Sequence, residues 1–354
     1  MIKKILITST FCLVLLIITL ILIINKLSNT PYGRFDPVLA VSFKMVELFQ
    51  NWEKETEEET LKTFYNPELM DKMRWGAIKG VGYVTKKVPF SGIIADNKIP
   101  GEAGDIPIRI YTPQGKGPFP VLIYFHGGGF ILGNIEYQDS ITRSISEKAS
   151  VIVISVEYRL APEHPFPAGL NDAYEAVKWA SRNSKTINAD PERLAVAGPS
   201  AGGNLAAAVS LMSRDKSPGL IDFQVLIYPV INLAEFNTAS YNNFAKGYNL
   251  TRQKMKYSRA LYITNKADLT NPYVSPIYAE NFSNLPPALI IGAGFDPLRD
   301  EGKAYSNKLK EAGIDVTYII YDTMAHGFIL YSKLLSEAED VVDDIARALN
   351  KQFN

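Results

Sequence analysis

Residues 193–209 read RLAVAGPSAGGNLAAAV: a short apolar run, a serine close to two glycines and an alanine-rich segment. The run Leu194 to Ala197 suits a buried strand, and the segment from about Ala201 to Arg214 suits a helix. A tight turn between them leaves Ser200 at its apex, and Gly198 and Gly202 let strand and helix pass closely. Such a strained turn would push the serine hydroxyl clear of the backbone, as a candidate nucleophile. A serine that merely opens a helix is the alternative, so the rest of the chain has to supply partners for this hydroxyl.

The composition argues against several classes of function. The 354 residues include 37 Lys and Arg against 37 Asp and Glu, and zero net charge gives no electrostatic reason to expect a nucleic-acid partner. Three histidines and a single cysteine, Cys12, argue against a zinc site. The chain also lacks the glycine motifs that bind phosphates and dinucleotides. We therefore expect neither a metal nor a cofactor.

Residues 1–30 are predicted to be a membrane anchor. Residues 5–24 carry no charged side chain, with Lys3 and Lys4 before them and Lys26 after them. A run of about 20 such residues matches the apolar thickness of a bilayer, so we expect an uncleaved single-pass helix with the bulk of the chain outside the cytoplasm. A cleaved signal peptide, giving a secreted protein, and a buried helix are the alternatives. No Ala-x-Ala cleavage site follows the run.

Beyond residue 30 the hydrophobic pattern changes from helical to alternating. Residues 36–78 repeat apolar side chains every three or four positions, which predicts helices, whereas residues 81–94 and 106–111 are predicted as strands. Further buried strands, each followed by a helical pattern, are predicted at 119–125, 151–156, 194–197, 223–228, 288–293 and 316–321. This alternation predicts a mostly parallel central sheet with helices on both faces. A polar insert at about 232–283 interrupts the rhythm.

The strand at 119–125 runs directly into His126-Gly-Gly-Gly-Phe130. Three successive glycines leave amide N–H groups uncovered by side chains, which suits a cluster of donors for a negatively charged oxygen. A plain flexible loop is the alternative, but a glycine triplet after a histidine at a strand end is uncommon. We interpret His126 as an organiser of this loop. His164, beside Glu163 in the proline-rich loop 158–168, is interpreted as structural, with the pair buried under the site.

A nucleophilic serine needs an imidazole to accept its proton and a carboxylate to orient that imidazole. His326 is the only histidine after Ser200, and it follows a predicted strand, where an open α/β sheet places its active-site loops. Asp296 also lies just past a strand. Asp322 is close to His326 in sequence and Asp300 opens a helix, so we prefer Asp296 as the acid. The order Ser, Asp, His is that of α/β-hydrolases.

Five blocks of the chain together resemble the hormone-sensitive lipase-like family of α/β-hydrolases. The blocks are HGGGF (126–130), YRLAPEHPFPA (158–168), GPSAGGNLA (198–206), NLPPALIIGAGFDPLRDEG (284–302) and AHGF (325–328). The family includes bacterial carboxylesterases and membrane-anchored arylacetamide deacetylases. The resemblance implies an α/β-hydrolase domain at 81–354 with a helical cap, formed by residues 31–80 and the 232–283 insert.

The resemblance also implies the site and its chemistry. Its nucleophile, acid and base would be Ser200, Asp296 and His326, and its oxyanion donors the amides of Gly128, Gly129 and Ala201. The implied reaction is hydrolysis of short to medium acyl esters of small molecules. Amide deacetylation is the alternative, followed by a non-catalytic ligand-binding protein on the same fold.

Position 199 departs from the family, which places aspartate where this chain has Pro199. Proline removes an amide donor, and the hydrogen bonds of the aspartate are lost with it. Gly198 tolerates the extended backbone that a following proline demands, so we still expect the turn to form.

Overall fold

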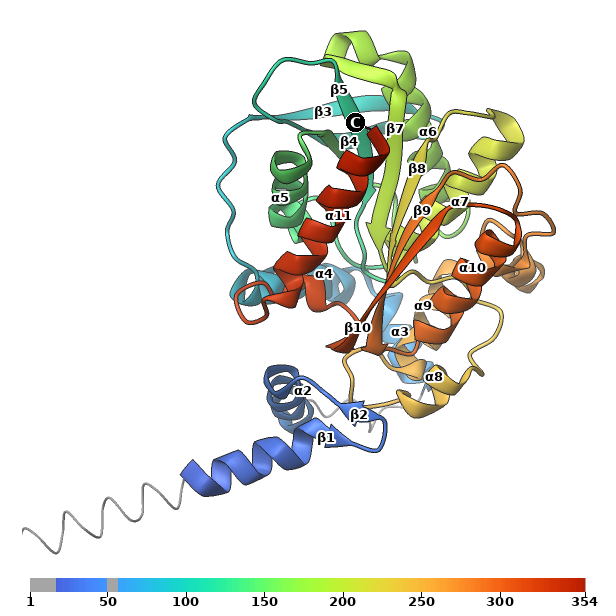
Figure 1. Cartoon of the computed structure of the whole chain (residues 1–354). Coiled ribbons are helices and arrows are strands. Elements are labelled where there is room, and N and C mark those ends of the chain that lie inside the picture. The colour runs from blue at the N-terminus through green and yellow to red at the C-terminus, as the bar shows by residue number, and fades with distance from the viewer. Residues whose placement is uncertain (1–16, 50–56, 354) are drawn as a thin grey trace, which may run out of the picture.

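The computed structural model describes residues 17–49 and 57–353 (Figure 1). Its centre is a sheet of eight strands: β3 (Ile93–Gly101), β4 (Gly104–Thr112), β5 (Phe119–Phe125), β6 (Ile152–Val156), β7 (Ala189–Pro199), β8 (Phe223–Ile227), β9 (Ala288–Phe295) and β10 (Val316–Ala325). Their order across the sheet is β10-β9-β8-β7-β5-β6-β4-β3. The strands from β10 to β6 run parallel, whereas β4 pairs antiparallel with both β6 and β3. The predicted mostly parallel sheet is confirmed.

Helices cover both faces of this sheet (Figure 1). One face carries α5 (Asp139–Ala149) and α11 (Glu337–Phe353), and the other carries α6 (Ala168–Arg182), α7 (Ala201–Lys216) and α10 (Arg299–Glu311). Successive residues of β5 point to opposite faces, so Leu122 and Tyr124 enter the core under α5 and α11, while Ile123 and Phe125 enter the core under α7. Burial on both faces explains why the strands read as unbroken apolar runs.

Between residues 37 and 262 of the described chain, five helices, which we call the cap helices, lie outside these two layers. They are α2 (Pro37–Phe49), α3 (Glu57–Phe64) and α4 (Pro67–Val84) from the N-terminal part, and α8 (Ala239–Asn243) and α9 (Arg252–Tyr262) from the insert. In Figure 1, α2, α3, α8 and α9 lie below the sheet, at the end to which the parallel strands run. The described residues also form short elements: the hairpin β1 (Asn29–Thr30) and β2 (Gly33–Arg34), and the 3₁₀ turns η2 (Glu136–Gln138), η3 (Ser184–Ile187), η4 (Lys266–Thr270), η5 (Pro276–Tyr278) and η6 (Phe328–Leu330).

The predicted strand at 81–94 is wrong over most of its length. Helix α4 continues to Val84, and the chain enters β3 only at Ile93. The carbonyl oxygen of Val84 accepts a hydrogen bond from the N–H of Lys333, and the hydroxyl of Thr85 donates to the carbonyl oxygen of Leu330. These bonds to a distant segment satisfy groups at the helix end that no local residue serves, and they outweigh the β-propensity of the valines.

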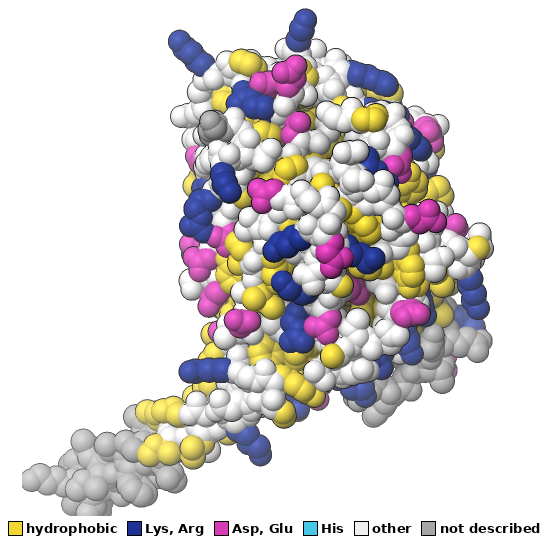
Figure 2. Space-filling view, turned by 45° about the vertical axis from the view of Figure 1, so that its right-hand side comes forward, with side chains coloured by type: hydrophobic (Ala, Val, Ile, Leu, Met, Phe, Trp, Pro, Cys, Tyr) yellow, Lys and Arg dark blue, Asp and Glu magenta, His cyan; other side chains and the backbone are white. Residues whose placement is uncertain are grey.

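The N-terminal part of the described chain projects from the body of the molecule. Residues 17–28 are helical and extend away from the sheet, and Figure 2 shows apolar side chains along this helix. Six aliphatic side chains here are between 47% and 62% exposed: Ile17, Ile18, Leu20, Ile21, Leu22 and Ile23. Much of the predicted anchor, residues 5–16, lies outside the described residues. Across residues 17–49 and 57–353, no helix has the length and apolarity needed to cross a membrane.

Candidate active site

The turn after β7 holds Ser200 in a strained backbone conformation. Its φ is 58° and its ψ is −118°, outside the regions that residues with a Cβ ordinarily occupy. The flanking glycines make this turn possible, because a Cβ at Gly198 would lie 2.4 Å from the carbonyl oxygen of Phe125, and one at Gly202 only 1.9 Å from it. The Ser200 N–H donates to the carbonyl oxygen of Ile227 on β8 at 2.8 Å. The serine is thus fixed at the edge of the sheet where the parallel strands end.

His326 connects Ser200 to a buried carboxylate. Its Nε2 lies 2.9 Å from the Ser200 Oγ, and its Nδ1 lies 2.7 Å from Oδ2 of Asp296. An ionised carboxylate only accepts hydrogen bonds, so the Nδ1 proton points to Asp296 and Nε2 is free to accept the serine proton. Asp296 is fully buried, and its Oδ1 accepts from the N–H of Leu298 at 2.8 Å. The structure therefore brings together the three side chains singled out from the sequence.

The two rival carboxylates lie in other surroundings. Asp300 accepts from the N–H of Ser240 at 2.8 Å and pairs with Arg299 at 2.9 Å. Asp322 is exposed. Neither is hydrogen-bonded to His326.

Residues 126–132, which we call the oxyanion loop, lie against the serine turn. A Cβ at Gly202 would come within 2.8 Å of the carbonyl oxygen of His126, so the two segments are in backbone contact. Gly128 and Gly129 have positive φ angles of 127° and 65°, which only glycine adopts readily. The amides of Gly128, Gly129 and Ala201 donate to no acceptor among the residues that the structure describes. These three N–H groups remain available to a negatively charged oxygen.

His126 is an internal support of this loop. The ring is buried, stacks on Tyr158 with ring centroids 4.3 Å apart, and places Nδ1 2.9 Å from the carbonyl oxygen of Gly127. The Tyr158 hydroxyl donates to the His126 carbonyl oxygen at 2.7 Å. Burial lowers the pKa of His126 to about 4, so the imidazole is neutral at pH 7. A buried, neutral histidine with no bond to Ser200 organises the loop and does not act as the base.

Pro199 is the last residue of β7 and pairs with Ile227 of β8. Its ring Cγ would lie 3.4 Å from a Cβ at Gly127, so the proline packs beneath the oxyanion loop. The strained turn forms with proline at this position.

The expectation that Glu163 and His164 form a buried pair is wrong. Both side chains are exposed, and the Glu163 carboxylate binds Arg74 of α4 at 2.7 and 3.0 Å. The physical reason is the cap helix α4, whose arginine reaches the proline-rich loop from outside and pairs with the glutamate near solvent. The sequence contained no signal for this contact, because the two residues are 89 positions apart.

Two further polar groups near the site were not predicted. The Asn249 side chain donates to the carbonyl oxygen of His326 at 2.9 Å and so braces the histidine turn. Glu301 is 3% exposed and accepts from the N–H groups of Ile231 and Asn232 at 2.7 and 3.2 Å. In sequence Glu301 resembles an ordinary acid at a helix start. Within the described ranges, no group of three or more His, Cys, Asp or Glu residues could hold a metal ion.

The fold and the hydrogen-bonded row of acid, imidazole and hydroxyl define the class of serine-dependent α/β-hydrolases. Comparison with known proteins leads to the same class. Residues 122–330 match the family described as alpha/beta hydrolase fold. The chain is 42% identical to the carboxylic ester hydrolase LipN of Mycobacterium tuberculosis over 67% of its length, and 41% identical to an arylesterase of Saccharolobus solfataricus over 76%. These matches span 64% of LipN and 90% of the arylesterase.

A solved structure of an esterase has the same fold. A hyperthermophilic esterase from the archaeon Pyrobaculum calidifontis superimposes with a TM-score of 0.80 at 36% identity, covering 90% of this chain and 98% of that one. The chain therefore belongs to the α/β-hydrolase fold family, within its hormone-sensitive lipase-like branch of carboxylic ester hydrolases.

Proposed function

We propose that the protein is a serine carboxylic-ester hydrolase that works through an acyl-enzyme on Ser200. The observation that carries this proposal is the row Asp296–His326–Ser200, with separations of 2.7 and 2.9 Å. The serine Oγ attacks the ester carbonyl carbon while His326 Nε2 accepts its proton. Asp296 holds the imidazole in the required tautomer and stabilises the imidazolium.

The oxyanion that forms is bound by backbone amides. Gly128, Gly129 and Ala201 offer N–H groups without other acceptors among the described residues. Each such donor contributes on the order of 3 kcal/mol to lowering the barrier. The tetrahedral intermediate collapses, His326 protonates the departing alcohol, and the acyl group remains on Ser200. A water molecule, deprotonated by His326, then attacks the acyl-enzyme, releases the carboxylic acid and restores the serine.

The proposed substrates are small-molecule esters with short to medium acyl chains. Helix α9 supports this limit, because it lies directly over the oxyanion loop. The Tyr262 ring stacks on Phe130 at 3.9 Å, and Ser258 Oγ lies 2.7 Å from where a Cβ of Gly129 would be. Similar proteins bear the names carboxylesterase, arylesterase and ethyl acetate hydrolase. The packing of α9 on the oxyanion loop favours acyl chains of modest length.

A panel of p-nitrophenyl esters of rising acyl length, with a matching p-nitroanilide, tests the proposal. We expect hydrolysis of the short esters and covalent labelling of Ser200 by an organophosphate. Ser200→Ala should lower the rate by about a million-fold, the loss found when such a serine is removed. Faster cleavage of the anilide than of the ester would favour amide deacetylation. An inhibitor-free preparation that cleaves neither, or a Ser200→Ala variant with unchanged activity, would rule out the hydrolase.

We also propose that residues 5–24 anchor the protein in a membrane as a single-pass helix, with the catalytic part outside the cytoplasm. The uncharged run and the exposed aliphatic side chains at 17–23 support this placement. In a membrane preparation, the full chain should stay in the pellet after alkaline carbonate extraction. Recovery of the intact full-length chain in the supernatant would contradict the anchor, and recovery of a chain shortened by its first 30 residues would indicate a cleaved signal.

A further inference from the structure

Arg74 lies on cap helix α4 and binds both loops that flank the oxyanion site. Its Nε donates to the carbonyl oxygen of Ile131 at 3.0 Å, and its Nη2 donates to the carbonyl oxygen of Ala161 at 3.1 Å. The two terminal nitrogens also bind the Glu163 carboxylate in a bidentate pair. One side chain of the cap therefore reaches the oxyanion loop and the proline-rich loop 158–168 at the same time.

The Ile131 end of this contact is coupled to an oxyanion donor. The N–H groups of Ile131 and Leu132 donate to the carbonyl oxygen of Gly128 at 3.2 and 2.9 Å. That carbonyl shares a planar peptide group with the N–H of Gly129, so the direction of one sets the direction of the other. A residue that holds Ile131 in place therefore also aims the Gly129 N–H.

The loop needs such support, because its glycines do not limit their own conformation. Gly128 and Gly129 have φ angles of 127° and 65°, and a glycine reaches many other conformations at little cost. Two other hydrogen bonds join the two loops: the Ala161 N–H donates to the Phe130 carbonyl oxygen at 3.0 Å, and the Tyr158 hydroxyl donates to the His126 carbonyl oxygen at 2.7 Å. Arg74 binds the carbonyl oxygen of Ile131, the residue after Phe130, and the carbonyl oxygen of Ala161. It therefore reinforces the bond between Ala161 and Phe130.

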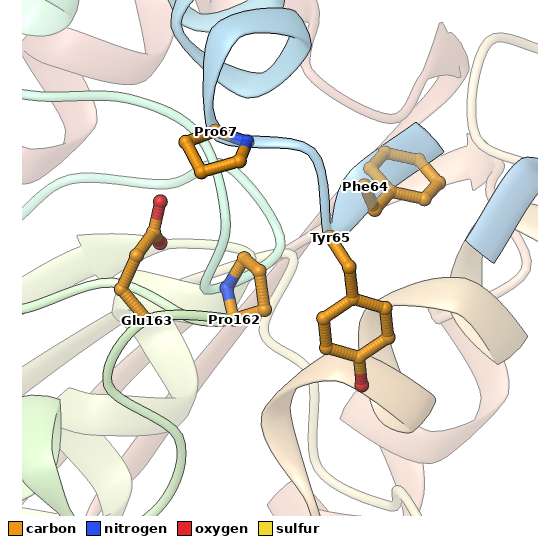
Figure 3. Close-up of a pocket in the computed structure, with 5 residues that line it drawn as sticks. All are labelled: Phe64, Tyr65, Pro67, Pro162 and Glu163. Carbon is orange, nitrogen blue, oxygen red and sulfur yellow. The ribbon is translucent and has the colours of Figure 1, made fainter. Parts of the chain in front are cut away.

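A surface pocket lies between the cap and the proline-rich loop, beside Glu163, the ion-pair partner of Arg74. Figure 3 shows this pocket, bordered by Phe64, Tyr65 and Pro67 on the cap side and by Pro162 and Glu163 on the loop side. Where apolar side chains leave such a hollow, they do little to fix the two sides relative to each other. Directed hydrogen bonds then determine the register of cap and loop.

We propose that Arg74 is a positioning residue that couples the seating of the cap to the geometry of the oxyanion donors. Its guanidinium holds the Ile131 carbonyl, and through it the Gly128–Gly129 peptide, in the orientation that binds the developing oxyanion. This inference rests on the proposed ester hydrolysis. It gives the cap a part in catalysis, because an unseated α4 leaves the donors misaligned while Ser200 and His326 stay in place.

The test compares Arg74→Met with Lys72→Met, which removes an exposed charge from the same helix. Turnover of p-nitrophenyl butyrate is measured per serine titrated with an organophosphate, together with inhibition by a trifluoromethyl ketone, which forms an oxyanion on the serine. Arg74→Met should lower kcat by about 10- to 100-fold with KM within about threefold, and weaken the ketone by a similar factor. Lys72→Met should stay within about twofold of the wild type for both.

A purely structural role would lower the melting temperature and leave kcat per titrated serine and ketone inhibition unchanged, and that result overturns the proposal. Arg74→Lys settles the case if the Met variant fails to fold, because one ammonium cannot reproduce the fork of bonds. We expect kcat about fivefold lower or more in a stably folded Lys variant, and wild-type kcat there also overturns the inference. A wild-type protein that hydrolyses no ester would instead refute the proposed function, whatever Arg74 does.

Discussion

The position of Ser200 depends on Gly202 having no side chain. A Cβ there would lie 1.9 Å from the carbonyl oxygen of Phe125 and 2.8 Å from that of His126. Strand, helix and loop would all have to separate, so Gly202→Ala should lower the free energy of unfolding by about 3 kcal/mol or more. Urea unfolding provides the measurement. Gly80→Ala on the exposed side of α4 meets nothing within 4 Å and should be neutral or stabilising by up to ~1 kcal/mol. Equal effects of the two changes would contradict the close backbone packing.

His126 should make the fold sensitive to acid. Burial lowers the pKa of this residue to about 4 from an ordinary value of 6.5. Between these values the unfolded chain binds a proton that the folded chain does not, so the free energy of unfolding falls as the pH drops through this window. At pH 4 the loss from this residue is on the order of 3 kcal/mol. Urea unfolding at pH 7 and pH 4.5 should show a smaller pH-dependent loss for His126→Gln than for the wild type. The exposed His164→Gln variant is the control, and a wild-type pH dependence in His126→Gln would disprove the effect.

Among the elements, α10 is tied to the start of the insert by Glu301. Burial raises the pKa of its carboxyl well above the usual range, which favours the neutral acid, and its Oε1 serves two backbone N–H groups. Glu301→Gln keeps a neutral acceptor of the same shape and should change the free energy of unfolding by less than ~1 kcal/mol. Glu301→Ala leaves the two buried donors unpaired and should cost about 2–4 kcal/mol. Denaturant midpoints of the two variants provide the comparison. An equal loss of stability in both would show that accepting the two backbone hydrogen bonds is not how Glu301 stabilises the fold.

The order of elements explains what could be predicted from the sequence. Ser200, Asp296 and His326 each follow a strand whose apolar run is readable, and parallel strands end at a common edge, so their meeting could be expected. The C-terminal turn of α4 and the contacts of Arg74 could not be predicted in this way. Arg74 has partners 57 to 89 residues away, and an arginine on an amphipathic helix looks like any solvated cation. Contacts of this kind depend on how cap and sheet are placed together, which local periodicity does not encode.

For the molecule as a whole, the segment before the sheet has two parts with different burial. The side chains of Ile17 to Ile23 are largely exposed, whereas Phe35 and Leu39 are buried. Phe35 contacts the ring of Phe295, directly before Asp296, with ring centroids 4.9 Å apart. The next residue, Asp36, donates its N–H to the carbonyl oxygen of Thr323 at 3.0 Å, three positions before His326. The two residues directly before α2 therefore brace the ends of β9 and β10, which are followed by the acid and the base.

Two truncations separate these parts. Among the described residues, a chain beginning at Leu27 loses exposed side chains and the half-buried Ile24. Its kcat/KM on a short soluble ester should stay within about threefold of the full-length value, with a similar melting temperature. A chain beginning at residue 50 also loses Phe35 and Leu39, whose burial contributes about 1.5–3 kcal/mol each. It should unfold at markedly lower temperature, and lose activity as the braces of Asp296 and His326 disappear. If both truncations kept full activity and stability, α2 would be dispensable and the support of the acid and base would have to come from the sheet alone.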